Sequence, residues 1–126
     1  MSARTPLGRA RGLGSAKTGT GHWWAQRVTA LALVPLIIWF VVSMITVTGA
    51  DHEAAKAFIG SPINAVLLIL LIIATFHHGH LGLQVVIEDY INTKWLEVAL
   101  ILSVKGAAIF LGVASVYAVF AIALGG

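Results

Sequence analysis

Three apolar segments, each long enough to cross a lipid bilayer, constrain the fold of this chain more than any other feature. They cover about residues 25–48, 63–88 and 96–124 of the 126-residue sequence. A bilayer core roughly 30 Å thick requires about 20 helical residues, and a spanning segment must satisfy its backbone hydrogen bonds internally. With 59% hydrophobic and only 10% charged residues, the chain has more apolar surface than a soluble domain of this size can bury. We therefore predict an all-α integral membrane protein with three transmembrane helices.

The sequence divides into a basic head and a single membrane domain. Residues 1–20 are rich in Gly, Ser, Thr and Arg, and we expect them to form a flexible N-terminal head. Residues 21–126 form the three-helix transmembrane domain. Within it, Pro35 predicts a mild kink in the first helix, which a helix bundle tolerates. The polar loop before the second span has room for one helical turn, capped by Asp51.

Lysine and arginine are distributed unevenly between the two sides of the membrane. Lys56 is the one basic residue in the loop between the first and second spans. The positive-inside rule therefore predicts an N-inside, C-outside topology. We expect the basic head to contact anionic membrane lipid and to bind no nucleic acid. The predicted inner side holds Arg4, Arg9, Arg11, Lys17, Arg27 and Lys94.

The second span carries polar side chains that need a partner inside a membrane. His77, His78 and His80 follow its apolar half, and Asp89 and Tyr90 stand at its predicted inner end. Asp89 lies roughly 16 Å along the helix from His78 at about 1.5 Å per residue, so His78 lies about halfway through the membrane. A neutral imidazole at that depth needs a partner for its nitrogens, and haem iron is one such partner.

Three interpretations of the histidine-rich helix are open from the residues alone. Buried polar side chains often only bond a neighbouring helix. A metal-transport site is a second possibility, but the three histidines fan around the helix and no intramembrane carboxylate accompanies them. The third is a haem ligand at His78, with Gly82 one turn away leaving room for a flat group. Because no other predicted span contains a histidine, a second axial imidazole would have to come from another polypeptide.

These residues resemble a known family. His78, ten further residues and then Asp89 and Tyr90, on the second of three spans, form a pattern similar to that of the hydrophobic membrane anchor of succinate dehydrogenase, respiratory complex II. The stretch GHWWAQRVTALALVPL, which contains Arg27, also resembles the start of the first helix in that family. The likeness covers about residues 20–124.

The resemblance implies a membrane anchor that is not catalytic on its own. It implies half of a heterodimeric anchor bundle in the inner (cytoplasmic) membrane, as a multi-pass protein paired with a second, cytochrome b556-type anchor. The pair would hold haem b and dock an iron–sulfur subunit and a flavoprotein subunit on the inner face. His78 would be one axial haem ligand, a histidine of the cytochrome b556-type anchor the second, and Arg27 would lie near the haem propionates. Asp89 and Tyr90 would belong to the ubiquinone site, where electrons from succinate reach the quinone.

Simpler or different assignments stay open beside the resemblance. Tyr90 and Asp89 are also consistent with an interfacial anchor and a solvated acid, and Arg27 with a charge that reaches out of the membrane. Another quinone-linked oxidoreductase, such as a quinol:fumarate reductase, would need a similar anchor or cytochrome b subunit. A non-redox metal-handling membrane protein is the more distant alternative. The chain has no cysteine, so it cannot itself hold an iron–sulfur cluster by thiolates.

The third span holds two features that the resemblance does not explain. Lys105 lies about ten residues into the span, where a lysine costs roughly 2.5–3.5 kcal/mol on insertion scales. We expect it to reach toward the inner surface or to find a haem propionate or a carboxylate of a partner. Ala108 and Gly112 have the spacing of small residues at a close helix contact.

Overall fold

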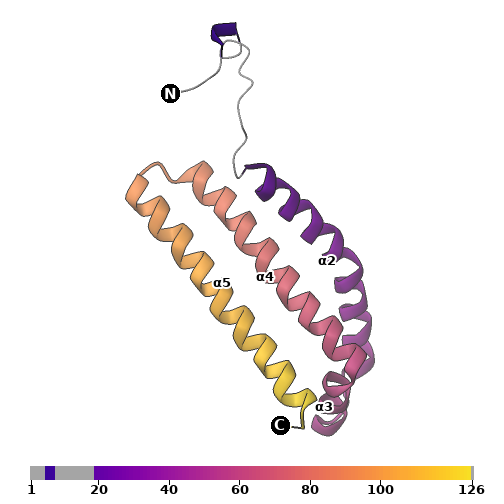
Figure 1. Ribbon diagram of the computed structural model, residues 1–126. Coiled ribbons are helices and arrows are strands. Elements are labelled where there is room, and N and C mark those ends of the chain that lie inside the picture. The colour runs from indigo at the N-terminus through magenta and orange to yellow at the C-terminus, as the bar shows by residue number, and fades with distance from the viewer. Residues whose placement is uncertain (1–4, 8–18, 126) are drawn as a thin grey trace.

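The computed structural model of the protein describes residues 5–7 and 19–125. The chain forms α2 (Gly19–Val47), α3 (His52–Gly60), α4 (Pro62–Tyr90) and α5 (Lys94–Ala123), as Figure 1 shows. No strand occurs within these described ranges, so the prediction of an all-α protein is confirmed. The predicted N-terminal head, residues 1–20, lies almost entirely outside the described residues.

Three of the helices are long and apolar enough to cross a membrane. The spans are Thr20–Val47, Pro62–Tyr90 and Lys94–Ala123, with 28, 29 and 30 residues. At about 1.5 Å per residue they are roughly 42 to 45 Å long, and a bilayer core is only about 30 Å thick. The ends of each helix therefore reach into the headgroup region, and the prediction of three transmembrane helices is confirmed.

Helix α2 begins earlier than the hydropathy of the sequence predicts. The helix starts at Gly19 rather than near residue 25, so His22 and Trp23 lie on its first turns. Hydropathy marks where lipid begins, whereas a helix extends as far as its residues can continue the hydrogen-bonded backbone. Pro35 lies inside the helix without ending it, and α2 curves along its length in Figure 1.

The connection between α2 and α4 contains a helix longer than the single turn that the sequence predicts. Helix α3 has nine residues, and its first turn is capped as expected, because Ala54 N donates to Asp51 Oδ1 at 2.8 Å. The connection from α2 turns at Gly49, whose φ of +86° lies in the left-handed region that favours glycine. At the other end of α3, Pro62 occupies the first turn of α4, where a missing N–H costs nothing.

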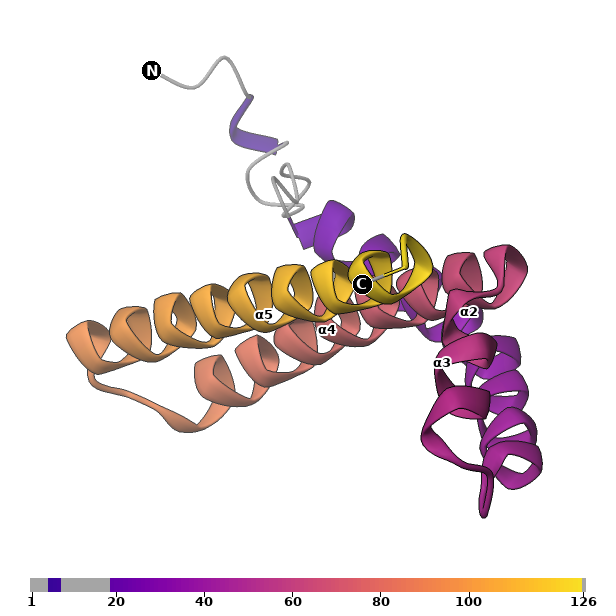
Figure 2. The ribbon, with the colours of Figure 1, turned by 90° about the horizontal axis from the view of Figure 1, so that it is seen from below.

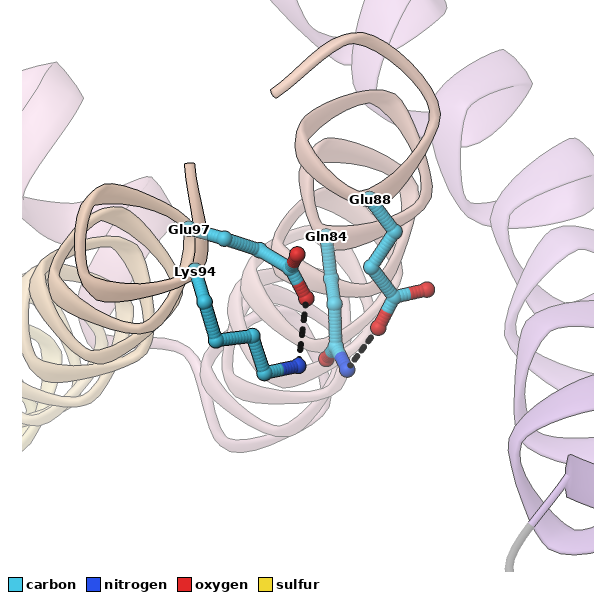
Figure 3. Close-up of polar contacts among 4 residues, drawn as sticks. All are labelled: Gln84, Glu88, Lys94 and Glu97. Atoms are coloured by element: carbon cyan, nitrogen blue, oxygen red, sulfur yellow. Dashed lines mark hydrogen bonds and ion pairs between the residues drawn. The ribbon is translucent and has the colours of Figure 1, made fainter. Parts of the chain in front are cut away.

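The loop between α4 and α5 is shorter than the sequence predicts. The sequence indicates a loop over residues 88–95, but α4 continues through Tyr90 and α5 begins at Lys94. Asp89 and Tyr90 therefore lie in the last turn of a helix rather than in a loop. Lys94 Nζ lies 3.4 Å from Glu97 Oε1, a one-turn ion pair at the start of α5 that Figure 3 shows. An exposed pair of this kind contributes only about 0.3–0.5 kcal/mol.

Helix α4 is the central element of the membrane domain. It packs against α2 on one side and α5 on the other, while α2 and α5 do not contact each other within the described residues (Figures 1 and 2). At the contact with α5, a Cβ added at Gly112 would lie 3.6 Å from the Phe76 ring, so this small residue does allow a close helix approach.

Three helices side by side bury few side chains. The buried hydrophobic side chains of the described residues are Leu33, Ala65, Leu68, Ala74, Leu81 and Val119. Broad apolar faces of all three helices therefore remain for lipid or for another polypeptide. These exposed apolar faces are consistent with a chain that forms one half of a larger helix bundle.

Candidate functional site

Polar side chains of α2 and α4 meet in a cleft at the end of the molecule where α2 begins and α4 ends. The cleft has a volume of about 520 Å³. Side chains one helical turn apart create its two walls, because residues at i and i+4 share a helix face. Its polar lining residues are His22, Gln26 and Arg27 from α2 and Gln84 and Glu88 from α4.

The amide side chains of the cleft still have capacity for hydrogen bonds. Gln84 Nε2 donates to Glu88 Oε1 at 2.9 Å along α4, as Figure 3 shows. The side-chain oxygens of Gln84 and Gln26 are buried, and neither accepts a hydrogen bond from the residues that the structure describes. Buried acceptors of this kind are rarely left unpaired, so the cleft suits water or a bound donor.

Arg27 stands at the wall of this cleft. Its guanidinium carbon lies 5.3 Å from the centre of the Trp23 ring, within the range of a cation–π contact. Glu88 lines the same cleft, but Arg27 forms no ion pair with it or with any other carboxylate in the described ranges. The forked donors of Arg27 are thus available for an acceptor that this chain does not supply.

His78 lies deeper in the membrane and faces α2. The side chain is half-buried, and its Nδ1 lies 3.1 Å from Thr29 Oγ1. Tyr90, the last residue of α4, follows His78 by twelve positions, roughly 18 Å along the axis, so the imidazole lies well inside the hydrocarbon core. One ring nitrogen therefore has a partner within the chain, and Nε2 is the nitrogen that remains for an external group.

The other two histidines of α4 lie toward α5. The His77 and His80 rings pack edge to face with centres 5.1 Å apart. His80 Nδ1 lies 3.1 Å from the carbonyl oxygen of Phe76, one turn earlier on the same helix. The three histidines thus fan around α4 as predicted, and within the described residues no three His, Asp or Glu side chains form a metal-binding group.

Asp89 and Tyr90 lie outside the cleft. The Tyr90 side chain is 78% exposed, and Asp89 is exposed as well. Within the described residues no hydrogen bond joins the two side chains, and neither contributes to the lining of the cleft. A site built on them would open away from this chain and would need a second polypeptide to enclose it.

Comparisons with known proteins decide the family. Residues 1–122 match the family described as the succinate dehydrogenase/fumarate reductase transmembrane subunit. The chain belongs to this family. It is 38% identical over 117 residues to a succinate dehydrogenase hydrophobic membrane anchor subunit of Rickettsia bellii, covering 93% of this chain and 94% of the relative. The subunit of the same description from Paracoccus denitrificans is 36% identical over 122 residues, covering 96% and 93%.

A more distant relative is the succinate dehydrogenase membrane anchor subunit of Reclinomonas americana, 25% identical over 96 residues, with 74% of this chain and 80% of the relative covered. The resemblance inferred from the His78 to Tyr90 pattern is therefore confirmed for the succinate dehydrogenase family. The roles of the individual residues remain predictions.

Sequence reasoning missed several residues of this membrane anchor that line the cleft or contact His78. The sequence places His22 before the first span, but it lies on α2 and lines the cleft. Gln26 and Thr29 carry no pattern that separates them from ordinary residues of an apolar helix. Only the register of α2 against α4 brings Thr29 to His78.

The structure changes the interpretation of Gly82, whereas that of Lys105 stays a prediction. The sequence suggests that Gly82 leaves room for a flat group, but a Cβ built there would meet the Gln26 side chain at 3.6 Å, so the position faces α2. Lys105 is exposed on α5, is not among the lining residues of the cleft and forms no ion pair within the part of the chain described.

Proposed function

We propose that this protein is the non-catalytic membrane anchor of a succinate:ubiquinone oxidoreductase in the inner (cytoplasmic) membrane. Family membership supports the role of a membrane anchor, and one observation supports a role in haem binding. His78 is a half-buried imidazole inside a membrane span, with one nitrogen bonded to Thr29 and the other available. We infer that His78 Nε2 is an axial ligand of haem b.

The donor set around His78 fits a haem better than a bare metal ion. A haem supplies its own four equatorial nitrogens and needs only axial ligands from the protein, and imidazole is a common one. A bare ion would need further side chains, and the described residues offer no such group. When bound, the haem would supply one-electron redox chemistry.

Arg27 suits the haem propionates. It shares the cleft with Gln84 and Glu88, which follow His78 by six and ten residues on α4. The cleft therefore lies roughly 9 to 15 Å from His78 along the helix, toward the predicted inner surface. A guanidinium without an ion-pair partner can bind a carboxylate through two parallel hydrogen bonds.

Tyr90 and Asp89 are the proposed contribution to the ubiquinone site. A phenol O–H at the membrane surface can donate a hydrogen bond to a quinone carbonyl, which gains negative charge as the quinone is reduced. Asp89, next in the chain and exposed, can carry protons from the inner aqueous phase to the reduced quinone. Their exposure supports a site shared with another polypeptide.

The rest of the complex would come from other chains. A cytochrome b556-type anchor would cover the exposed helix faces and provide the second axial histidine. An iron–sulfur subunit and a flavoprotein subunit would dock at the end that carries Tyr90, and the succinate site would lie in the flavoprotein. Membrane lipid would cover the remaining apolar surface.

A fumarate-reducing complex is the second candidate. The family description covers both succinate dehydrogenase and fumarate reductase. The relatives from Rickettsia bellii, Paracoccus denitrificans and Reclinomonas americana carry the succinate dehydrogenase name, which favours succinate oxidation. A metal-handling protein has no support from this family.

The test is a reduced-minus-oxidised absorbance spectrum of the purified complex. We expect a b-type haem band in the wild type that disappears in His78→Ala. The band should persist in His77→Ala and His80→Ala, which are matched controls because both are histidines on the same helix. A haem band that survives in His78→Ala, or a folded complex without haem, would contradict the ligand assignment.

A further inference from the structure

We propose that Thr29 is a positioning residue for the haem ligand. Its hydroxyl would fix His78 in the tautomer that carries the proton on Nδ1 and would hold Nε2 toward the iron. The inference rests on the proposed role of His78, but it concerns a residue on a different helix, for which sequence pattern predicts no function.

The hydroxyl of Thr29 has two possible acceptors on its own helix. Thr29 Oγ1 lies 2.7 Å from the Ala25 carbonyl oxygen and 3.2 Å from that of Gln26. A carbonyl can only accept, so the single hydroxyl proton is directed to α2, most strongly at the 2.7 Å contact. The lone pairs of Oγ1 then remain for a donor.

His78 Nδ1 is that donor. It lies 3.1 Å from Thr29 Oγ1, a hydrogen-bond distance for a nitrogen and an oxygen. Because the hydroxyl proton is already used, the bond requires a hydrogen on Nδ1. A neutral imidazole with its proton on Nδ1 has its lone pair on Nε2, which is the form that binds a metal.

The bond would also affect how strongly the imidazole donates electrons to the iron and how the ring is oriented. A ligating histidine whose second nitrogen donates a hydrogen bond is a more basic ligand and keeps a defined orientation. A stronger donor stabilises ferric haem relative to ferrous haem, and second-sphere hydrogen bonds of this kind adjust haem potentials. Thr29 would therefore lower the midpoint potential of the haem.

His80 forms a different kind of hydrogen bond from that of His78. His80 Nδ1 bonds the Phe76 carbonyl of its own helix, so that bond does not tie α4 to α2. The Thr29–His78 pair instead joins two spans, and it fixes the imidazole relative to the wall that carries Arg27.

The experiment compares Thr29→Val, Thr29→Ser and Thr46→Val in the purified complex, with midpoint potential and low-temperature EPR of the ferric haem as readouts. Valine keeps the shape of threonine but cannot accept the bond, whereas serine keeps the hydroxyl. Thr46 is the matched control, because among the described residues its Oγ1 bonds only the Ser43 carbonyl oxygen of its own helix, at 2.7 Å.

We expect Thr29→Val to weaken haem retention about tenfold, the lower end of second-sphere effects, with a higher midpoint potential and an altered EPR signal. Thr29→Ser and Thr46→Val should match the wild type. If Thr29→Val keeps the wild-type potential and EPR signal while His78→Ala loses the haem, the role of Thr29 is wrong and the proposed function stands. If His78→Ala keeps the haem, the ligand assignment fails and the role of Thr29 fails with it.

Discussion

Tyr90 is the residue on which the proposed quinone site depends most. Its ring stands 78% exposed on the last turn of α4, at the level where a helix of this length leaves the hydrocarbon core. The phenol can therefore reach a ligand that enters from lipid and is covered by another polypeptide. The second tyrosine, Tyr117, is similarly exposed at 74% but lies near the other end of α5.

Replacing Tyr90 with phenylalanine should slow quinone reduction specifically. Loss of a hydrogen bond to a carbonyl that becomes charged costs about 1.5–3 kcal/mol, or roughly 10- to 100-fold in rate. We expect succinate:quinone reductase activity of the complex to fall by that factor, while succinate oxidation by an artificial acceptor stays unchanged. Tyr117→Phe is the control and should keep both rates. Equal wild-type rates in Tyr90→Phe would exclude the phenol from the site.

At the scale of elements, α4 carries the proposed haem ligand and quinone contacts, and its packing positions them. Contacts with α2 bring Thr29 to His78, and contacts with α5 hold the opposite face. The α4–α5 contact depends on small residues, because Gly112 allows the Phe76 ring to approach the backbone of α5. Lipid offers little hydrophobic drive for helix association, so such close packing contributes much of the affinity between helices.

A larger residue at Gly112 should separate α4 from α5. An added Cβ would lie 3.6 Å from Phe76, which is an ordinary contact, so we expect Gly112→Ala to be nearly neutral. Gly112→Leu overpacks the contact and should lower the free energy of unfolding of the purified chain in detergent by about 1–3 kcal/mol.

Gly106→Leu is the matched control for this change. Gly106 is on the same helix, and nothing lies within 4 Å of an added Cβ within the described residues. Denaturant unfolding followed by circular dichroism measures all three variants. Equal stability of Gly112→Leu and Gly106→Leu would show that the Gly112 contact does not hold the helices together.

At the scale of the whole molecule, the fold is an open layer of helices whose two connecting loops lie at opposite ends. Arg27, Lys94 and Tyr90 lie toward the same end, because α2 begins where α4 ends and α5 begins (Figure 1). Helix α3, with Lys56, lies at the opposite end with the end of α5. Lys94 therefore shares an end of the molecule with Arg27, whereas Lys56 lies at the opposite end, and which end faces the inner side of the membrane is a prediction from charge.

The predicted N-inside, C-outside topology can be tested by cysteine labelling. The chain has no cysteine, so single substitutions give an unambiguous signal. In intact spheroplasts, a membrane-impermeant maleimide should label His52→Cys, at the start of α3. Asn92→Cys, between α4 and α5, should react only after the cells are opened and the complex is solubilised in denaturing detergent. The reverse pattern would show that the topology is inverted.

Much of this architecture follows from local features of the sequence. The spans follow from apolar length, and the α3 cap at Asp51 follows from a side chain that bonds its own helix start. The position of His78 within the membrane follows from helix rise alone. The early start of α2 and the continuation of α4 to Tyr90 were missed, because polar residues at helix ends look like loop in a hydropathy pattern.

The sequence by itself determined the three spans, the pattern from His78 to Tyr90 and the asymmetry of basic residues, since each depends on residue type and spacing along one chain. Only the tertiary structure decided that Thr29 meets His78, that Gly82 faces Gln26, and that Arg27 shares a cleft with Glu88. Each pair joins a residue of α2 to a residue of α4, and it forms because of the faces that the two helices turn toward each other and the offset between them along their axes. Many registers bury similar apolar surface, and side-chain packing selects among them.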